Sequence, residues 1–158
     1  MRPHSIVAPV VISLLFVTGC GGGGGSSTGP TTGPMTATID GASWVATLSV
    51  EARRTHSGAA GIISLAGSNN NGLGLGVAFP DSGVQSYTLG GFHPSNATIL
   101  QGASAWVANV TGGSGTVTVT ALDATHVAGT FAFNAVPTPG TSASGTKHVT
   151  NGHFDIPF

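Results

Sequence analysis

Apolar and polar residues alternate between positions 115 and 135, on both sides of a short polar break at Asp123–Thr125. Alternation with a period of two predicts strands that have one apolar and one polar face, and the break predicts a turn. We therefore expect an antiparallel hairpin whose apolar face needs a second layer of structure to bury it. The apolar positions are Val117, Val119, Ala121, Val127, Phe131 and Phe133, and the polar ones include Thr116, Thr118, Thr120 and Thr130.

The same pattern recurs along the chain after residue 35 and predicts further short strands. Asp40-Gly41 is a strong hairpin-turn signal, and the polar residues 68–72 are typical of a loop. Residues 147–158 form an expected last strand, with a bulge at Asn151-Gly152. The other expected strands are 36–39, 43–51, 61–67, 73–79 and 84–91, and the segments 97–102 and 104–110 are expected to make one or two more. An exposed connection is expected at 136–145.

About eight to ten short strands at this spacing predict an all-β fold. We expect an antiparallel β-sandwich over residues 36–158, with an up-and-down β-barrel as the alternative. Helical periodicity is confined to the first twenty residues. Arg53, Arg54 and His56 form the basic spot of the chain, and His56 is expected in a loop before a turn at Gly58. The expected inward-facing residues also include Trp44, Ala46, Leu48 and Val50 on one strand and Trp106 on another.

The first nineteen residues have the organisation of an export signal. Arg2 precedes the apolar stretch 6–17, which is shorter than the ~20 residues that a membrane-spanning helix needs. The residues Leu15 to Cys20 then resemble the lipobox of bacterial lipoproteins, with Val17 at the aliphatic position. In that family the cysteine receives a diacylglyceryl group and becomes the mature N-terminus. The alternative is ordinary cleavage that leaves Cys20 as a free thiol.

Residues 20–35 are rich in Gly, Ser, Thr and Pro and are expected to form a disordered tether. About fifteen such residues give a root-mean-square reach of ~20 Å. We therefore expect an exported domain that is held at the cell envelope through lipid on Cys20. In enterobacterial lipoproteins an aspartate after the cysteine favours the inner membrane, so Gly21 favours the outer membrane.

Composition limits the classes of partner. Charged residues make up only 6% of the chain, so a basic surface that could neutralise nucleic-acid phosphates is not expected. Cys20 is the single cysteine, which excludes a disulfide within the chain.

Histidines are the main candidates for chemistry. If Asn151-Gly152 made a tight turn, His148, His153 and Asp155 would lie close together and could bind a metal ion. If one strand instead runs through, alternation places His148 on the face opposite His153 and Asp155. We favour the second arrangement, because closed zinc sites need three or four ligands. His126 is expected in an exposed turn.

Other motifs are weaker. Ser104 in Gly102-Ala103-Ser104-Ala105 lies in a strand pattern rather than the strand-to-helix turn of a serine hydrolase. The glycines of 72–76 alternate along a strand, where they would let a neighbouring layer approach closely, and they are not a phosphate loop. Trp44 and Trp106 could line a sugar-binding face, but a core position fits their alternating apolar neighbours better. The glycosylation sequons at Asn96 and Asn109 carry little weight in a bacterial lipoprotein.

The ordered series of motifs resembles a family of small secreted bacterial domains with no assigned function, which often occur as lipoproteins. The resemblance implies a tethered β-sandwich and supplies no catalytic residues. We therefore expect a non-enzymatic binding or structural module without a cofactor, with a small-ligand or metal-binding protein as the alternative. The matching segments are Thr38–Gly41 with Trp44, Tyr87–Gly90, Gly115–Thr120 with Leu122-Asp123, Gly129–Phe133 and Val149–Phe154.

Overall fold

The computed structural model describes residues 33–57 and 60–158. The expected signal peptide, Cys20, most of the expected tether and Gly58 lie outside these residues. The described ranges hold no apolar helix of the length that crossing a membrane requires. The strands are β1 (Met35–Ile39), β2 (Ala42–Val45), β3 (Leu48–Ser57), β4 (Ala60–Ser68), β5 (Leu73–Pro80), β6 (Ser86–Leu89), β7 (Asn96–Gln101), β8 (Ser104–Ala108), β9 (Ser114–Leu122), β10 (His126–Pro137) and β11 (Lys147–Pro157).

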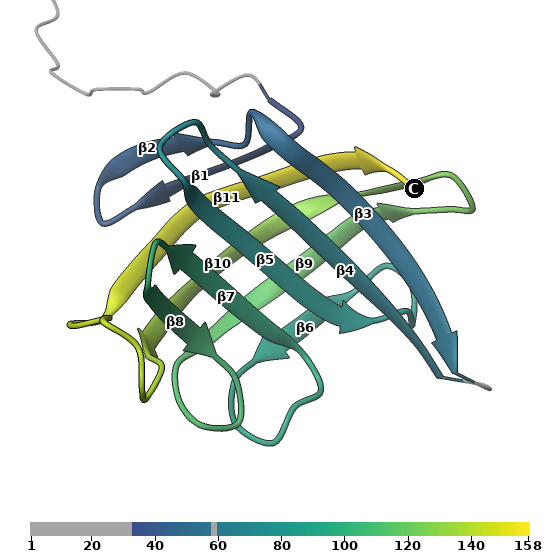
Figure 1. Cartoon of the computed structure of the whole chain (residues 1–158). Helices are drawn as coiled ribbons and strands as arrows, with labels where there is room; N and C mark the ends of the chain where they lie inside the picture. Colours follow the sequence, from purple (N-terminus) through teal and green to yellow (C-terminus); the bar gives the residue numbers. More distant parts are fainter. Residues whose placement is uncertain (1–32, 58–59) are drawn as a thin grey trace, which may run out of the picture.

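These strands form one antiparallel sheet that curls strongly into a half-barrel. Its main path is β2-β1-β11-β10-β8-β7-β5-β4-β3, and β9 and β6 branch from β10. The long strand β10 pairs with β9 as far as Asn134 and then with β8 through Val136 and Pro137, so it passes from one half of the sheet to the other. In Figure 1 the strands β3, β4, β5, β7 and β8 cross in front of β1, β11, β10, β9 and β6.

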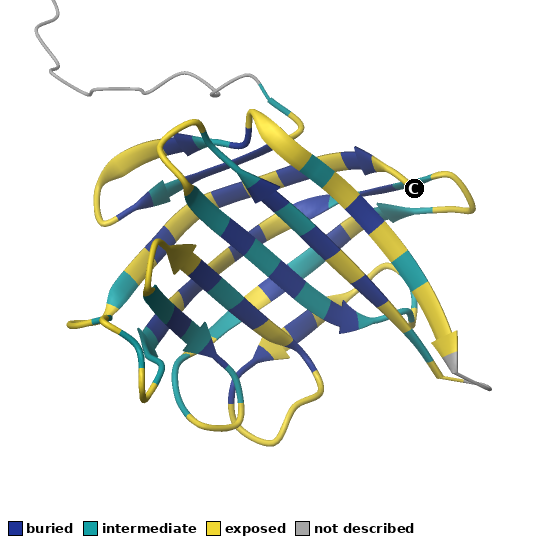
Figure 2. Ribbon diagram, viewed as in Figure 1, coloured by how far each residue is buried: buried dark blue, intermediate teal, exposed yellow. Residues whose placement is uncertain are grey.

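The all-β antiparallel prediction is confirmed, but the strands belong to one curled sheet rather than to two separate sheets. Residues 33–57 and 60–158 form eleven strands, where about eight to ten were expected. Buried and exposed residues alternate along most of them (Figure 2), as a sheet with a single core requires.

The single strand expected at 43–51 is wrong, because the chain divides there into β2 and β3. The N–H of Ala46 donates to the carbonyl of Met35 in β1, whereas the N–H of Thr47 donates to the carbonyl of Ser68 in β4. These two adjacent residues therefore donate hydrogen bonds to strands that lie near opposite ends of the strand order, β1 and β4. Leu48, expected on the buried face of Trp44, is 49% exposed.

The hairpin expected at 115–135 is confirmed as β9 and β10. Val117, Val119, Val127, Phe131 and Phe133 are buried in the core. The threonines that alternate with them lie exposed or half-buried on the outer face.

Three phenylalanines of the core lie against glycines of neighbouring strands. Phe131 is paired with Gly152, Phe154 with Gly129, and Phe133 with Gly115. A Cβ atom built on Gly129 would lie 2.6 Å from Cζ of Phe154, and one on Gly152 would overlap the ring and carbonyl oxygen of Phe131. Real Cβ atoms do not approach this closely, so these positions admit only glycine without rearrangement.

The remaining aromatic contacts connect this group of rings to the other half of the sheet. Phe154 stacks on Phe131 at 6.4 Å between ring centroids, and it also lies 6.3 Å from Phe79 of β5. Phe79 in turn packs on Tyr87 of β6 at 5.1 Å. Apart from their buried area, such pairs contribute about 0.5–1.5 kcal/mol each.

Two turns follow the sequence-based predictions. Asp40 and Gly41 both have positive φ, at 50° and 82°, as a type I′ hairpin turn requires. In β11 the bulge expected at Asn151-Gly152 is present: Asn151 has a φ of 51°, and the register with β10 shifts there.

The other differences concern strand ends. Arg53, Arg54 and His56 lie within β3, so the expected loop position of His56 is wrong. β10 extends to Pro137, and the connection after it lies along β8, where the N–H groups of Thr138 and Ser142 donate to carbonyls of Ala105 and Ala103.

We predict that Gly152→Ala destabilises the protein by about 1–3 kcal/mol, because the added methyl group overlaps both the ring and the backbone of Phe131. Gly76→Ala in β5 is the matched control, since its Cβ would meet its nearest neighbour at an ordinary 3.6 Å. Urea unfolding of both variants measures the difference. Equal free energies of unfolding in the two variants would show that the phenylalanine–glycine contact imposes no constraint.

Asp40 joins the β1–β2 turn to β11 and gives a pH-dependent prediction. Its carboxylate accepts hydrogen bonds from the backbone N–H of His148 at 2.8 Å and from Nζ of Lys147 at 2.7 Å. The His148 bond, and then the Lys147 bond, hold the pKa of Asp40 below its ordinary value. A lowered pKa in the folded state means that this stabilisation is complete above the unfolded-state pKa and is lost as pH falls through the folded-state pKa.

We expect Asp40→Asn to cost about 1 kcal/mol at pH 7, a modest value because the carboxylate is 37% exposed. Asparagine tolerates positive φ and keeps an acceptor oxygen, so the substitution removes mainly the charge. Urea unfolding should show the full wild-type advantage at pH 7 and a progressively smaller one as the pH falls below the ordinary aspartate pKa of about 4. An advantage that is as large at pH 3 as at pH 7 contradicts the assignment.

Candidate functional site

The structure does not bring His148, His153 and Asp155 together. β11 is one strand with a bulge rather than a tight hairpin, so the turn that the metal hypothesis requires is not formed. Nδ1 of His148 lies 2.7 Å from Oδ1 of Asn134, whereas Asp155 contacts Nε2 of His126. Among the described residues there is no group of three or more His, Cys, Asp or Glu side chains that could hold a metal ion.

The expected face of His148 is also wrong, and the bulge is the reason. Simple alternation would place His148 opposite His153 and Asp155, but the extra residue at Asn151 restores them to the same outer face. Val149, Gly152, Phe154 and Ile156 are the buried residues of this strand, and the two histidines and Asp155 are exposed.

His126 forms a surface pair that the sequence did not indicate. It is half-buried at the start of β10, where an exposed position was expected, and it contacts Asp155 across the β10–β11 ladder. The turn before it is ordered by Asp123, whose Oδ1 accepts hydrogen bonds from the backbone N–H and the hydroxyl of Thr125. These bonds lower the pKa of Asp123, the backbone bond having the larger effect.

The other candidates occupy structural positions. Ser104 is paired with Gln101 at a β7–β8 turn, and the described part of the chain contains no helix to follow it. Trp44 and Trp106 are both in the core, as expected. Nε1 of Trp44 donates to the carbonyl of Leu73 at 3.1 Å, and Nε1 of Trp106 donates to that of Gly145 at 2.9 Å.

The glycines of 72–76 do not serve the expected close approach. Gly72 lies in the β4–β5 turn with a φ of 72°, whereas Gly74 and Gly76 lie in β5. A Cβ on either strand glycine would meet its neighbours at 3.6 Å or more, an ordinary contact. Close approach occurs instead at other described glycines, which include those of the phenylalanine contacts and Gly67, where a Cβ would lie 2.7 Å from Ala46.

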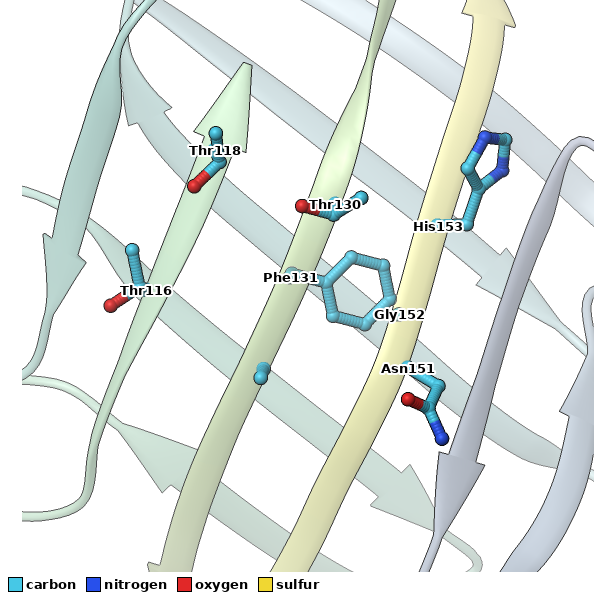
Figure 3. A pocket seen from close by; sticks show the side chains of 8 residues that line it. Thr116, Thr118, Thr130, Phe131, Asn151, Gly152 and His153 are labelled. Carbon is cyan, nitrogen blue, oxygen red and sulfur yellow. The ribbon is translucent and has the colours of Figure 1, made fainter. Parts of the chain in front are cut away.

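A shallow groove of about 450 Å³ lies on the outer face of β9, β10 and β11 (Figure 3). Phe131 and Gly152 are buried and form its floor, and the exposed side chains around them are uncharged hydrogen-bonding groups or methyl groups. The groove adjoins the bulge, which displaces β11 locally from regular pairing. The residues lining it are Thr116, Thr118, Thr130, Phe131, Ala132, Asn151, Gly152 and His153.

This groove can accept and donate hydrogen bonds to a neutral polar ligand. Hydroxyl and amide groups do both, and the imidazole of His153 does so in its neutral form. Sequence reasoning missed the groove, although its two signals were visible: the threonine alternation of β9 and the Asn-Gly pair of β11.

One end of the half-barrel carries two uncharged loops with exposed apolar side chains. Phe92 is 99% exposed in the β6–β7 loop, and Val110 is 61% exposed in the β8–β9 loop. The loops meet at their bases, where a Cβ on Gly90 would overlap the carbonyl oxygen of Gly113. In Figure 1 both loops lie at the bottom of the molecule, and the chain enters β1 at the top.

The charged side chains of the described residues include three separate structural contacts. Nε of Arg54 lies 2.8 Å from Asp81, and its guanidinium lies 4.4 Å from the ring centroid of Phe158. Glu51 and Arg53 form an exposed pair at 3.0 Å. Lys147 contacts Asp40 and also lies 5.2 Å from the ring centroid of Trp106.

Comparison with known protein families identifies the family to which this chain belongs. A family model described as "Domain of unknown function (DUF6252)" matches residues 31–156, which include every strand of the sheet except the last residue of β11. Neither the curated proteins nor the solved structures gave a significant match. Because the family model covers most of the chain, this protein belongs to the family described as Domain of unknown function (DUF6252).

Proposed function

We propose that this chain is a lipid-anchored protein of the bacterial cell envelope and that its curled sheet is a non-enzymatic binding or structural module. The observation that carries the proposal is the position of the single cysteine. Cys20 ends a lipobox-like sequence and is followed by a spacer rich in Gly, Ser, Thr and Pro, after which β1 begins at Met35. Each acyl methylene that enters the bilayer contributes ~0.8 kcal/mol, so two or three chains would anchor the domain stably.

The contacts of the acidic residues support a non-enzymatic role. Asp40 fixes a turn to β11, Asp81 binds Arg54 of β3, and Asp155 contacts His126 on the neighbouring strand. Each of these three carboxylates holds one strand or turn to another.

Anchoring through Cys20 would leave two surfaces free for contact with a partner: the pair of loops with exposed apolar side chains, and the groove on β9, β10 and β11. The chain enters the sheet at the end of the half-barrel away from the β6–β7 and β8–β9 loops (Figure 1). The groove lies on the outer face of the sheet and is likewise open. Gly21 after the cysteine favours the outer membrane as the location under the lipoprotein sorting rule.

A second candidate function is small-ligand binding in the same envelope setting. The groove over β9, β10 and β11 favours it, because its threonine, asparagine and histidine side chains suit a neutral polar ligand. The metal-binding form of this alternative receives no support from the geometry of His148, His153 and Asp155.

We predict that Cys20→Ala abolishes acylation of the protein and releases it from the membrane fraction, or leaves it with its signal segment uncleaved. Mass spectrometry of the purified chain, together with fractionation of the expressing bacterium, measures both effects. Ser26→Ala in the spacer is the control and should leave acylation and location unchanged. A processed wild-type chain that carries an unmodified thiol on Cys20 would disprove the anchor.

A further inference from the structure

The edges of the sheet are protected unequally. An unpaired strand edge exposes a row of N–H and C=O groups and invites pairing with another chain. β8 is covered by Val136 and Pro137 of β10 and by the segment after them, which donates hydrogen bonds to Ala105 and Ala103. β2 and β6 are edge strands of only four residues each.

β3 is different, because it is ten residues long and ends the sheet path. It pairs with β4 along one edge, and within residues 33–57 and 60–158 no strand pairs with the other edge. β3 contains no proline, and Figure 1 shows it as the outermost strand of the front half of the sheet. Among the described residues it therefore has the longest edge without a hydrogen-bonded partner strand, and β11 lies close to part of β3 without pairing with it.

The charges on β3 are complementary to those of the same strand in reverse. Glu51 and Arg53 flank Ala52 and point to the outer face, with side chains 48% and 72% exposed. If two β3 strands meet antiparallel about a two-fold axis at Ala52, each Glu51 faces an Arg53 of the other copy. Ala52 itself is buried and points into the core, so it leaves the pairing edge to the backbone. Glu51 and Arg53 also pair with each other within one chain at 3.0 Å, and across the axis each would gain a second partner of opposite charge.

Neighbouring residues are compatible with this register. Arg54 points to the inner side, where Asp81 and the ring of Phe158 already neutralise and cover it, so pairing leaves it no new unpaired charge. Ser49, with a φ of 52°, ends the regular strand on one side. The intermolecular pairing then covers residues Val50–Arg54 of each copy. Because this contact is short, it predicts reversible rather than obligate association.

We infer that the free edge of β3 is the site at which two copies of this chain associate, by antiparallel β3–β3 pairing centred on Ala52. The half-barrels would then share one continuous sheet across the dimer axis. The contact does not involve the groove, the Phe92 loop or Cys20, so it holds whether or not the chain is acylated.

The test is a charge-reversal series in the full chain, purified as the expressing cell processes it. Light scattering with the detergent mass subtracted should show a wild-type dimer at high micromolar concentration. Glu51→Arg and Arg53→Glu each place like charges opposite one another, so each should weaken the dimer by about tenfold or more. The double variant Glu51→Arg/Arg53→Glu restores opposite charges across the axis and should restore the dimer.

The double variant separates pairing from damage to the fold, because it contains both substitutions. Circular dichroism and thermal unfolding of all four proteins check that the sheet is intact. A wild-type chain that stays monomeric at high concentration overturns the inference, as does a double variant that remains monomeric. Single reversals that leave the dimer unchanged overturn it as well.

Discussion

The contact between phenylalanine rings and glycines on adjacent strands is the constraint on which the rest of this structure depends. A sheet that curls into a half-barrel brings its inner positions together, so side chains of ordinary size on every strand would collide. Phe131, Phe133 and Phe154 fill the inside of the β9–β10–β11 region, and Gly152, Gly115 and Gly129 leave room for them on the paired strands. The ring of Phe154 then reaches Phe79 on the other half of the sheet and closes the core.

The same constraint shapes the outer surface. β11 must place Val149, Gly152, Phe154 and Ile156 inward, and it does so by inserting one extra residue at Asn151. The bulge moves His148 to the outer face, and the groove above Phe131 lies beside it, lined by Asn151 and Gly152. Core packing, rather than an arrangement of reactive side chains, therefore produces the most distinctive surface feature near these histidines.

Charge is used sparingly and locally in this fold. Asp40 links a turn to the last strand, Arg54 with Asp81 links β3 to the end of β5, and Glu51 with Arg53 lies on the exposed edge of β3. With so few charges, edge protection depends on backbone coverage, as along β8, or on shortness, as in β2 and β6. β3 is neither covered in this way nor short, and we infer that a second copy of the chain pairs with its edge.

The sequence by itself determined the local elements of this protein. Period-two alternation located the β9–β10 hairpin and most other strands, Asp40-Gly41 marked a turn that needs positive φ, and Asn151-Gly152 marked the bulge. The burial of Trp44 and Trp106 also followed from their apolar neighbours. These features depend on residues close together in the chain, so local steric and hydrophobic rules suffice to predict them.

Only the tertiary structure decided how the elements combine. The division of 43–51 into β2 and β3 depends on Met35 and Ser68, which accept hydrogen bonds from adjacent residues at opposite ends of the sheet path. The partner of Asp155 is His126 because the β10–β11 register places them together, not because of spacing within the last strand. The curl depends on glycines that meet phenylalanines distant in sequence. Such contacts join positions that no local pattern relates, which is the physical reason that alternation predicted the strands and could not predict the half-barrel.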